Sequence, residues 1–184
     1  MIARAPPDPS SAGMVQFIFS PARIRAARPA DLAAVDRLLT RSYPALLRPD
    51  YPPSVMVLAV PRIARARPEL MASGTYYLME GPGGLIAAGG WTQASPVAGE
   101  GGARIGHVRH VATDPGHLRQ GHARRILQHA LDEARAAGMT GMACLSTRTA
   151  VPFYASLGFE IIEEVDVPLA PGVAFPAVRM TMRL

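Results

Sequence analysis

A glycine lies where a basic loop meets an amphipathic helix in the segment HLRQGHARRILQHALDEA, which runs from His117 to Ala134. The first turn of a helix carries amide hydrogens without a partner inside the helix and a partial positive charge, so it attracts anions. Glycine at position 121 has no side chain and would let a phosphate approach these amides closely. Four basic side chains near Gly121 add positive potential: Arg119, His122, Arg124 and Arg125. The segment predicts a phosphate-binding loop, although a turn glycine before a solvated basic helix face gives the same pattern.

Periodic apolar residues define the elements that must hold this loop. After Gly121, apolar residues repeat at helical spacing through Ala134, and residues 105–112 before the loop have the composition of a strand. Further strands are predicted at residues 24–26, 75–80, 85–91, 140–145, 159–167 and 178–182, and helices at residues 29–43, 54–60, 63–67, 121–137 and 149–157. We expect the first helix to end at Tyr43-Pro44, and residues 81–84 (GPGG) to form a hairpin turn.

This order of elements predicts an α/β (α+β mixed) fold class, with a mixed, mostly antiparallel central sheet and helices on both faces. The length of 184 residues fits one domain, and 49% hydrophobic with 18% charged residues is typical of a globular protein. We expect residues 1–20 to form a flexible N-terminal tail without the apolar stretch of a signal peptide, and residues 21–184 to form a single domain.

Composition excludes several classes of function. Cys144 is the single cysteine, so no internal disulfide can form, and a cytoplasmic location is expected. Aliphatic runs are too short to cross a bilayer, so no membrane partner is expected. The net charge is +5 and every basic residue other than histidine is arginine, which excludes a lysine-containing P-loop. The arginines are scattered rather than clustered with aromatic residues, which favours a small anionic ligand over nucleic acid.

Two motifs in order carry a resemblance to a known family. Residues 111–115 (VATDP), followed by Gly121-x-Ala123 at the start of a helix, are similar to the acetyl-CoA signature of the GCN5-related N-acetyltransferase (GNAT) family. Ala150-x-x-Phe153-Tyr154-x-x-x-Gly158-Phe159 resembles a second motif of that family. The order of elements is also similar, so the resemblance covers about residues 23–184.

Two residues depart from the family pattern. Leu118 occupies the first position of the acetyl-CoA motif, which is usually arginine or glutamine, and Arg119 beside it offers a substitute charge. Thr147 stands where many members have asparagine, three residues before Ala150. Both changes affect side-chain contacts with the co-substrate and leave the backbone amides in place.

The resemblance implies that acetyl-CoA is the co-substrate. Its pantetheine would pair with the main chain of Val111, Ala112 and Thr113 as an added strand would. Its diphosphate would lie on the loop and on the first turn of the helix. The remaining residues that the resemblance assigns to co-substrate binding are Arg119, Gln120, Gly121, His122, Ala123, Arg124 and Thr147.

Tyr154 and His110 are the predicted catalytic residues. Tyr154 matches the tyrosine that serves as general acid in many relatives, and a phenol is protonated at neutral pH; packing in the core is the alternative for this side chain. His110 is the first candidate for the general base and His107 the second, although on a regular strand the two point to opposite faces. The five histidines show no compact ligand spacing, so no metal site is predicted.

Together these features predict an acyltransferase, an N-acetyltransferase that moves an acetyl group from acetyl-CoA to an amine by direct attack. The alternative is a non-catalytic module that senses acyl-CoA. The partner is expected to be a small-molecule or peptide amine, and the sequence leaves its identity, and the formation of a homodimer, open. Glu80 and Glu100 are candidates for attracting a cationic amine, with solvated carboxylates as the alternative.

Overall fold

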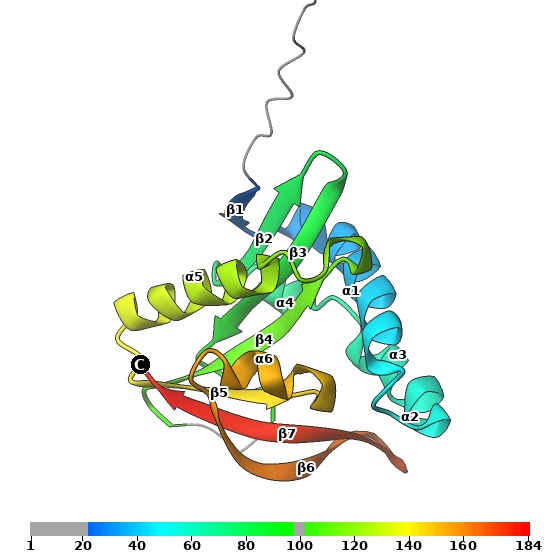
Figure 1. Ribbon diagram of the computed structural model, residues 1–184. Coiled ribbons are helices and arrows are strands. Elements are labelled where there is room, and N and C mark those ends of the chain that lie inside the picture. Colours follow the sequence, from blue (N-terminus) through cyan, green and yellow to red (C-terminus); the bar gives the residue numbers. More distant parts are fainter. Residues whose placement is uncertain (1–21, 98–101) are drawn as a thin grey trace, which may run out of the picture.

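The computed structural model describes residues 22–97 and 102–184, so the predicted tail at residues 1–20 and Glu100 lie outside the described residues. Seven strands form one sheet in the order β1-β2-β3-β4-β5-β7-β6 (Figure 1). The strands are β1 Arg23–Ala26, β2 Tyr76–Gly81, β3 Gly84–Thr92, β4 Ile105–Thr113, β5 Gly141–Ser146, β6 Glu160–Ala170 and β7 Val173–Arg183. The α-helices are α1 Leu32–Leu47, α2 Pro53–Leu58, α3 Val60–Ile63, α4 Pro68–Met71, α5 His122–Ala136 and α6 Val151–Ala155.

Neighbouring strands are antiparallel except for the parallel pair of β4 and β5. The pairing of β4 with β5 runs only from Ile105 opposite Gly141 to His107 opposite Ala143. Beyond this point the two strands diverge, and residues 108–113 of β4 pair with β3 alone. The main chain at the end of β4 therefore has one side free of a neighbouring strand.

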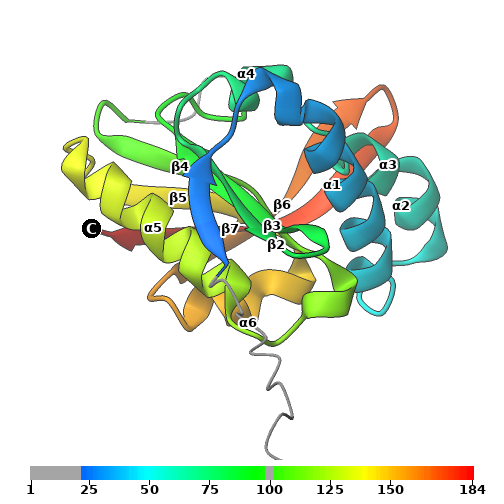
Figure 2. The ribbon, with the colours of Figure 1, turned by 90° about the horizontal axis from the view of Figure 1, so that it is seen from above.

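Helices α5 and α1 cover opposite faces of the sheet (Figures 1 and 2). From Ile126 to Ala134 the apolar stripe of α5 is buried against β2, β3 and β4, as its helical spacing predicted. Helix α1 buries Val35, Leu38 and Leu39 against the other face, where Ala88 and Ala112 lie beneath it. This arrangement confirms the predicted fold class of a mixed, mostly antiparallel sheet with helices on both faces. Within the described residues, no helix is long and apolar enough to cross a membrane.

The predicted end of the first helix at Tyr43-Pro44 was wrong. Helix α1 continues through Pro44 to Leu47. A proline inside a helix removes one backbone donor, but tertiary packing can outweigh this loss. Here Leu47, three residues after Pro44, is buried in a cluster with Tyr51 and Phe175. This packing favours continuation of the helix through the proline.

Three other elements differ from the sequence-based prediction. The helix predicted at residues 63–67 is replaced by α3, which ends at Ile63, and by α4 at Pro68–Met71, where proline occupies the favourable first position. The last two strands are longer than predicted because they pair with each other across a hairpin. Pro176 fits inside β7 because β5 pairs with β7 only from Val178 onward, which leaves one side of the β7 backbone open at Pro176.

A β-bulge interrupts the pairing of β3 with β4. The register shifts between Ala88 and Gly90, and His110 on the opposite strand has a φ of 41°. The hydroxyl of Tyr76 donates a hydrogen bond of 2.9 Å to the carbonyl oxygen of His110 and so fixes the bulge. The bulge lies directly before the free end of β4, where it reorients the strand.

Candidate active site

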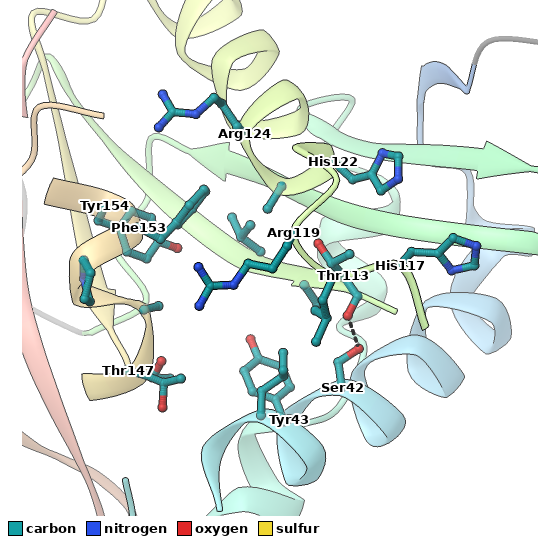
Figure 3. A pocket seen from close by; sticks show the side chains of 18 of the residues that line it. Ser42, Tyr43, Thr113, His117, Arg119, His122, Arg124, Thr147, Phe153 and Tyr154 are labelled. Atoms are coloured by element: carbon teal, nitrogen blue, oxygen red, sulfur yellow. Dashed lines mark hydrogen bonds between the residues drawn. The ribbon is translucent and has the colours of Figure 1, made fainter. Parts of the chain in front are cut away.

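A cavity of about 660 Å³ lies beside the free end of β4. Its walls come from four segments: the C-terminal half of α1, residues 111–113 of β4, the loop and first turn of α5 at residues 117–124, and residues 147–156 around α6. Figure 3 shows these segments facing one another across the space that the diverging strands leave open.

Most of the predicted co-substrate residues line this cavity. They are Val111, Ala112, Thr113, Arg119, Gly121, His122, Ala123, Arg124 and Thr147. Gln120 is not among the lining residues, and its side-chain oxygen instead lies 3.2 Å from Nε2 of His122. The structure therefore gathers residues that are up to 36 positions apart in the sequence around one space.

The N-terminus of α5 opens into the cavity at Gly121. This residue has a φ of 79°, in the left-handed region that favours glycine, and a Cβ atom built on it would meet no atom within 4 Å. No side chain caps the helix, so the amides of its first turn are available to a ligand. Helix α5 has 15 residues, and its N-terminus is uncapped and faces open space. This end of the helix fits a diphosphate, because both the amides and the helix dipole favour an anion.

Asp114 shapes the loop that leads to this helix. Its Oδ1 accepts a hydrogen bond of 2.9 Å from the amide of Gly116, and its Oδ2 lies 3.1 Å from Arg41 on α1. The Gly116 amide, with Arg41 and His117, holds the pKa of Asp114 below its usual range. The carboxylate therefore stays charged and fastens the loop to α1.

Two histidines lie side by side in the loop and the first turn of α5. The imidazole rings of His117 and His122 are 6.3 Å apart. Nδ1 of His117 lies 3.5 Å from Oδ1 of Asp114, whereas Nδ1 of His122 is buried without a hydrogen bond among the described residues. Desolvation, with the nearby His117 and Arg125, lowers the pKa of His122. Figure 3 shows both rings on the side of the loop that faces away from Tyr154. They form the outer rim of the cavity.

Tyr154 lines the inner part of the cavity from α6. It is 7% exposed and packs edge to face against Phe153 and Phe159, with ring centres 5.2 and 5.4 Å away. Burial raises the pKa of its phenol well above the usual value, and the nearby Cys144 and Tyr43 act in the same direction. The hydroxyl is therefore neutral and protonated throughout the ordinary pH range.

His110 and His107, the two candidates for a general base, do not line the cavity. Burial, together with Arg109 and Arg67, lowers the pKa of His110 to about 4. His107 is buried beside Ala143 and Arg179 at a separate small depression. The bulge at His110 changes the regular alternation of the strand without bringing either imidazole to the cavity.

Glu80, a candidate for attracting a cationic amine, is also remote from the cavity. Its carboxylate forms an ion pair of 2.6 Å with Arg25 on the neighbouring β1. Arg25 also binds Asp31, so Glu80 belongs to a network that joins an edge strand to the start of α1. Among the described residues, no cluster of three or more histidine, cysteine, aspartate or glutamate side chains is arranged to hold a metal ion.

Sequence reasoning did not identify the individual residues of α1 that line the cavity. Ser42, Tyr43, Leu46 and Leu47 form one wall, and Ser42 donates a hydrogen bond of 2.8 Å to the carbonyl oxygen of Thr113. The sequence signal that could have identified them is their helical spacing, which places one serine and three large apolar or aromatic residues on one face. Because the helix was expected to end at Pro44, Leu46 and Leu47 were not placed on the same helix face as Ser42 and Tyr43.

The comparison with protein families gives the decisive observation. Residues 72–161, which span β2 to the start of β6, match the family model of the acetyltransferase (GNAT) domain. The chain carries a GNAT domain. The match confirms the predicted family and the predicted class of activity, that of an acetyltransferase. No curated protein matches the chain by sequence.

Solved structures of GNAT proteins have the same fold. A GCN5-related N-acetyltransferase from Rhodopseudomonas palustris is 16% identical, with a TM-score of 0.71, over 91% of this chain and 98% of that chain. The PaiA N-acetyltransferase from Thermoplasma acidophilum in complex with coenzyme A is 13% identical, with a TM-score of 0.66, over 89% and 99% of the two chains. The ribosomal-protein-S18-alanine N-acetyltransferase from Escherichia coli is 19% identical, with a TM-score of 0.59, over 89% of this chain and 94% of that chain. At these identities the likeness shows a common fold.

Proposed function

We propose that this GNAT protein is an N-acetyltransferase that moves the acetyl group of acetyl-CoA to a primary or secondary amine, with Tyr154 as the general acid. One observation carries the proposal: a single cavity joins the open N-terminus of α5 at Gly121 to the phenol of Tyr154. An anchor for a diphosphate and a proton donor therefore face the same bound molecule. The amine-specific names of the solved relatives support the acceptor class.

The backbone would perform most of the binding. Amides of the first turn of α5 hold the diphosphate, while Arg119 and Arg124 at the cavity wall supply positive charge. The free edge of β4 at residues 111–113 offers main-chain groups to the pantetheine, as an added strand would use them. Because these groups are fixed by the sheet and by α5, the thioester is positioned before the amine arrives. Such positioning can contribute about 7–11 kcal/mol in ideal cases.

The amine nitrogen attacks the thioester carbonyl carbon and forms a tetrahedral intermediate. The carbon–sulfur bond then breaks, and the sulfur takes the proton of the Tyr154 hydroxyl. The nitrogen loses one proton, which restores the phenol, so the products are an amide and free coenzyme A. Acetyl-CoA supplies the activated acyl group and the thiolate leaving group. The protein holds the two reactants in place and donates the proton.

Burial of Tyr154 sets the conditions for this proton transfer. Its raised pKa keeps the phenol protonated, but it also makes the phenol a weaker acid in water. A thiolate that forms in the same apolar cavity is destabilised by the same lack of solvent, so its proton affinity rises as well. The transfer is therefore expected only while the cavity holds the ligand and excludes water. His110 lies outside the cavity, so no side chain is assigned to removing a proton from the amine before it attacks.

The direct test is release of free thiol from acetyl-CoA with a panel of amines, after calorimetry has established co-substrate binding. We expect turnover with at least one amine, and a fall in kcat of about 10²–10⁴-fold in Tyr154→Phe with unchanged affinity for coenzyme A. Tyr77→Phe is the matched control, because Tyr77 is a buried tyrosine that does not line the cavity. Binding without turnover for every amine would instead support the sensor module, and undiminished turnover in Tyr154→Phe would remove Tyr154 from the mechanism.

A further inference from the structure

A second phenol reaches the same cavity from the opposite wall. Tyr43 on α1 lines the cavity together with Tyr154 on α6. Figure 3 shows Tyr43 rising from α1 into the space that Arg119 and Tyr154 approach from the other side. The phenols are close enough for Tyr43 to raise the pKa of Tyr154. The cavity therefore presents two phenols to one bound molecule.

The position of Tyr43 is fixed by its neighbours on both sides. The preceding residue, Ser42, is 1% exposed and donates its 2.8 Å hydrogen bond to the carbonyl oxygen of Thr113, at the end of β4. The following residue, Pro44, is held inside the continuous helix. The ring of Tyr43 packs against two apolar clusters, one under α1 and one that contains Leu47 and Tyr51. Its orientation is therefore tied to the strand on which the acyl group is proposed to lie.

The side chain of Tyr43 is partly buried at the cavity wall, and its hydroxyl has no hydrogen-bond partner among the described residues. Because this side chain lines the cavity and its hydroxyl makes no hydrogen bond within the described protein, the hydroxyl is available to donate one to a molecule bound there. Burial also raises the pKa of the Tyr43 phenol above its usual value. The group is thus a neutral donor at any working pH.

We propose that the Tyr43 hydroxyl is a catalytic hydrogen-bond donor to the acyl oxygen of the tetrahedral intermediate. This inference rests on the proposed function. Tyr154 and Tyr43 approach from opposite walls, so two donors can meet the two atoms that gain negative charge, sulfur and oxygen. Tyr154 gives its proton to the sulfur, whereas Tyr43 keeps its proton and only stabilises the oxyanion. No bond to Tyr43 forms or breaks, and no further reactant is required.

A fixed donor of this kind has a defined kinetic signature. It acts on charge that exists only in the transition state and the intermediate, so its loss lowers kcat and leaves binding of both substrates nearly unchanged. Tyr43→Phe keeps the ring and deletes only the hydroxyl. We expect kcat to fall on the order of 10²-fold, with little change in KM for acetyl-CoA or for the amine.

The experiment compares wild type, Tyr43→Phe, Tyr154→Phe, the double variant and the control Tyr77→Phe in the thiol-release assay. Calorimetry with coenzyme A verifies an intact cavity in each. An unchanged kcat in Tyr43→Phe would overturn the proposal in favour of packing, and a raised KM for the amine at unchanged kcat would overturn it in favour of acceptor binding. If Tyr43→Phe does not fold, Ser42→Ala replaces it in the experiment. This variant keeps the Tyr43 hydroxyl but removes the hydrogen bond between α1 and Thr113, so we expect kcat to fall by a smaller factor. An unchanged kcat in Ser42→Ala would contradict the proposal. Absence of turnover in wild type would defeat the proposed function itself, which separates the two failures.

Discussion

Gly121 and Gly138 have nearly the same left-handed backbone, with φ values of 79° and 81°, at opposite ends of α5. A Cβ atom on either glycine would meet nothing within 4 Å. Only Gly121 borders the cavity. Substitutions at these two glycines can therefore distinguish a loss of stability from backbone strain and a loss of ligand affinity from a blocked anion site.

Substitution of each glycine by alanine gives the first prediction. A left-handed residue that is not glycine costs about 1–2 kcal/mol, so we expect Gly121→Ala and Gly138→Ala to lose similar stability in urea unfolding. In Gly121→Ala the new methyl group also faces the diphosphate, and affinity for coenzyme A should fall roughly tenfold or more in calorimetry. Equal affinities in the two variants would show that the ligand does not use this helix start.

The second prediction concerns the pH dependence of coenzyme A binding. In the free protein, desolvation, His117 and Arg125 hold the pKa of His122 below its usual value. A diphosphate nearby favours the charged imidazole and raises this pKa, so binding takes up a proton, and affinity increases as the pH falls through the interval between the two values. We expect affinity about three- to tenfold higher near pH 5.5 than near pH 8.

The ligand for this measurement is 3′-dephospho-coenzyme A, because the 3′-phosphate of coenzyme A itself titrates near pH 6. His122→Gln should flatten the pH dependence. His129→Gln, on the same helix but in contact with Tyr77, should leave it as in wild type. A slope that persists in His122→Gln would assign the proton uptake to another group.

The third prediction is a loss of stability at acid pH that depends on His110. Its pKa in the folded protein is about 4, below the ordinary value near 6.5, so the unfolded chain binds the proton more readily. Stability from the neutral imidazole is fully present above pH 6.5 and is lost as the pH falls toward 4. By linkage this amounts to about 2 kcal/mol at pH 5. Unfolding in urea at pH 7.5 and pH 5 measures it, and His110→Gln should lose about 2 kcal/mol less than wild type.

Local sequence signals were sufficient for much of the fold. The apolar stripe of α5 and the GPGG turn specify their structures through contacts between residues close in the chain, and both appear as predicted. The loop before Gly121 was also correctly expected to open onto a helix, because the glycine and the periodic pattern together mark this boundary.

Features that depend on distant contacts could not be predicted in this way. The passage of α1 through Pro44 is stabilised by Leu47 in a cluster with Phe175 on β7. The divergence of β4 from β5, which creates the cavity, depends on strand pairing rather than on any residue type. Tyr43 enters the site through these two effects, so the sequence motifs alone gave no indication of it.

The most direct measurement is a crystal structure of the protein with coenzyme A. We expect the diphosphate to accept hydrogen bonds of about 2.9 Å from amides in the first turn of α5, and the sulfur to lie within about 4 Å of the Tyr154 hydroxyl. Coenzyme A bound away from Gly121, or with its sulfur remote from Tyr154, would contradict the proposed site and its chemistry.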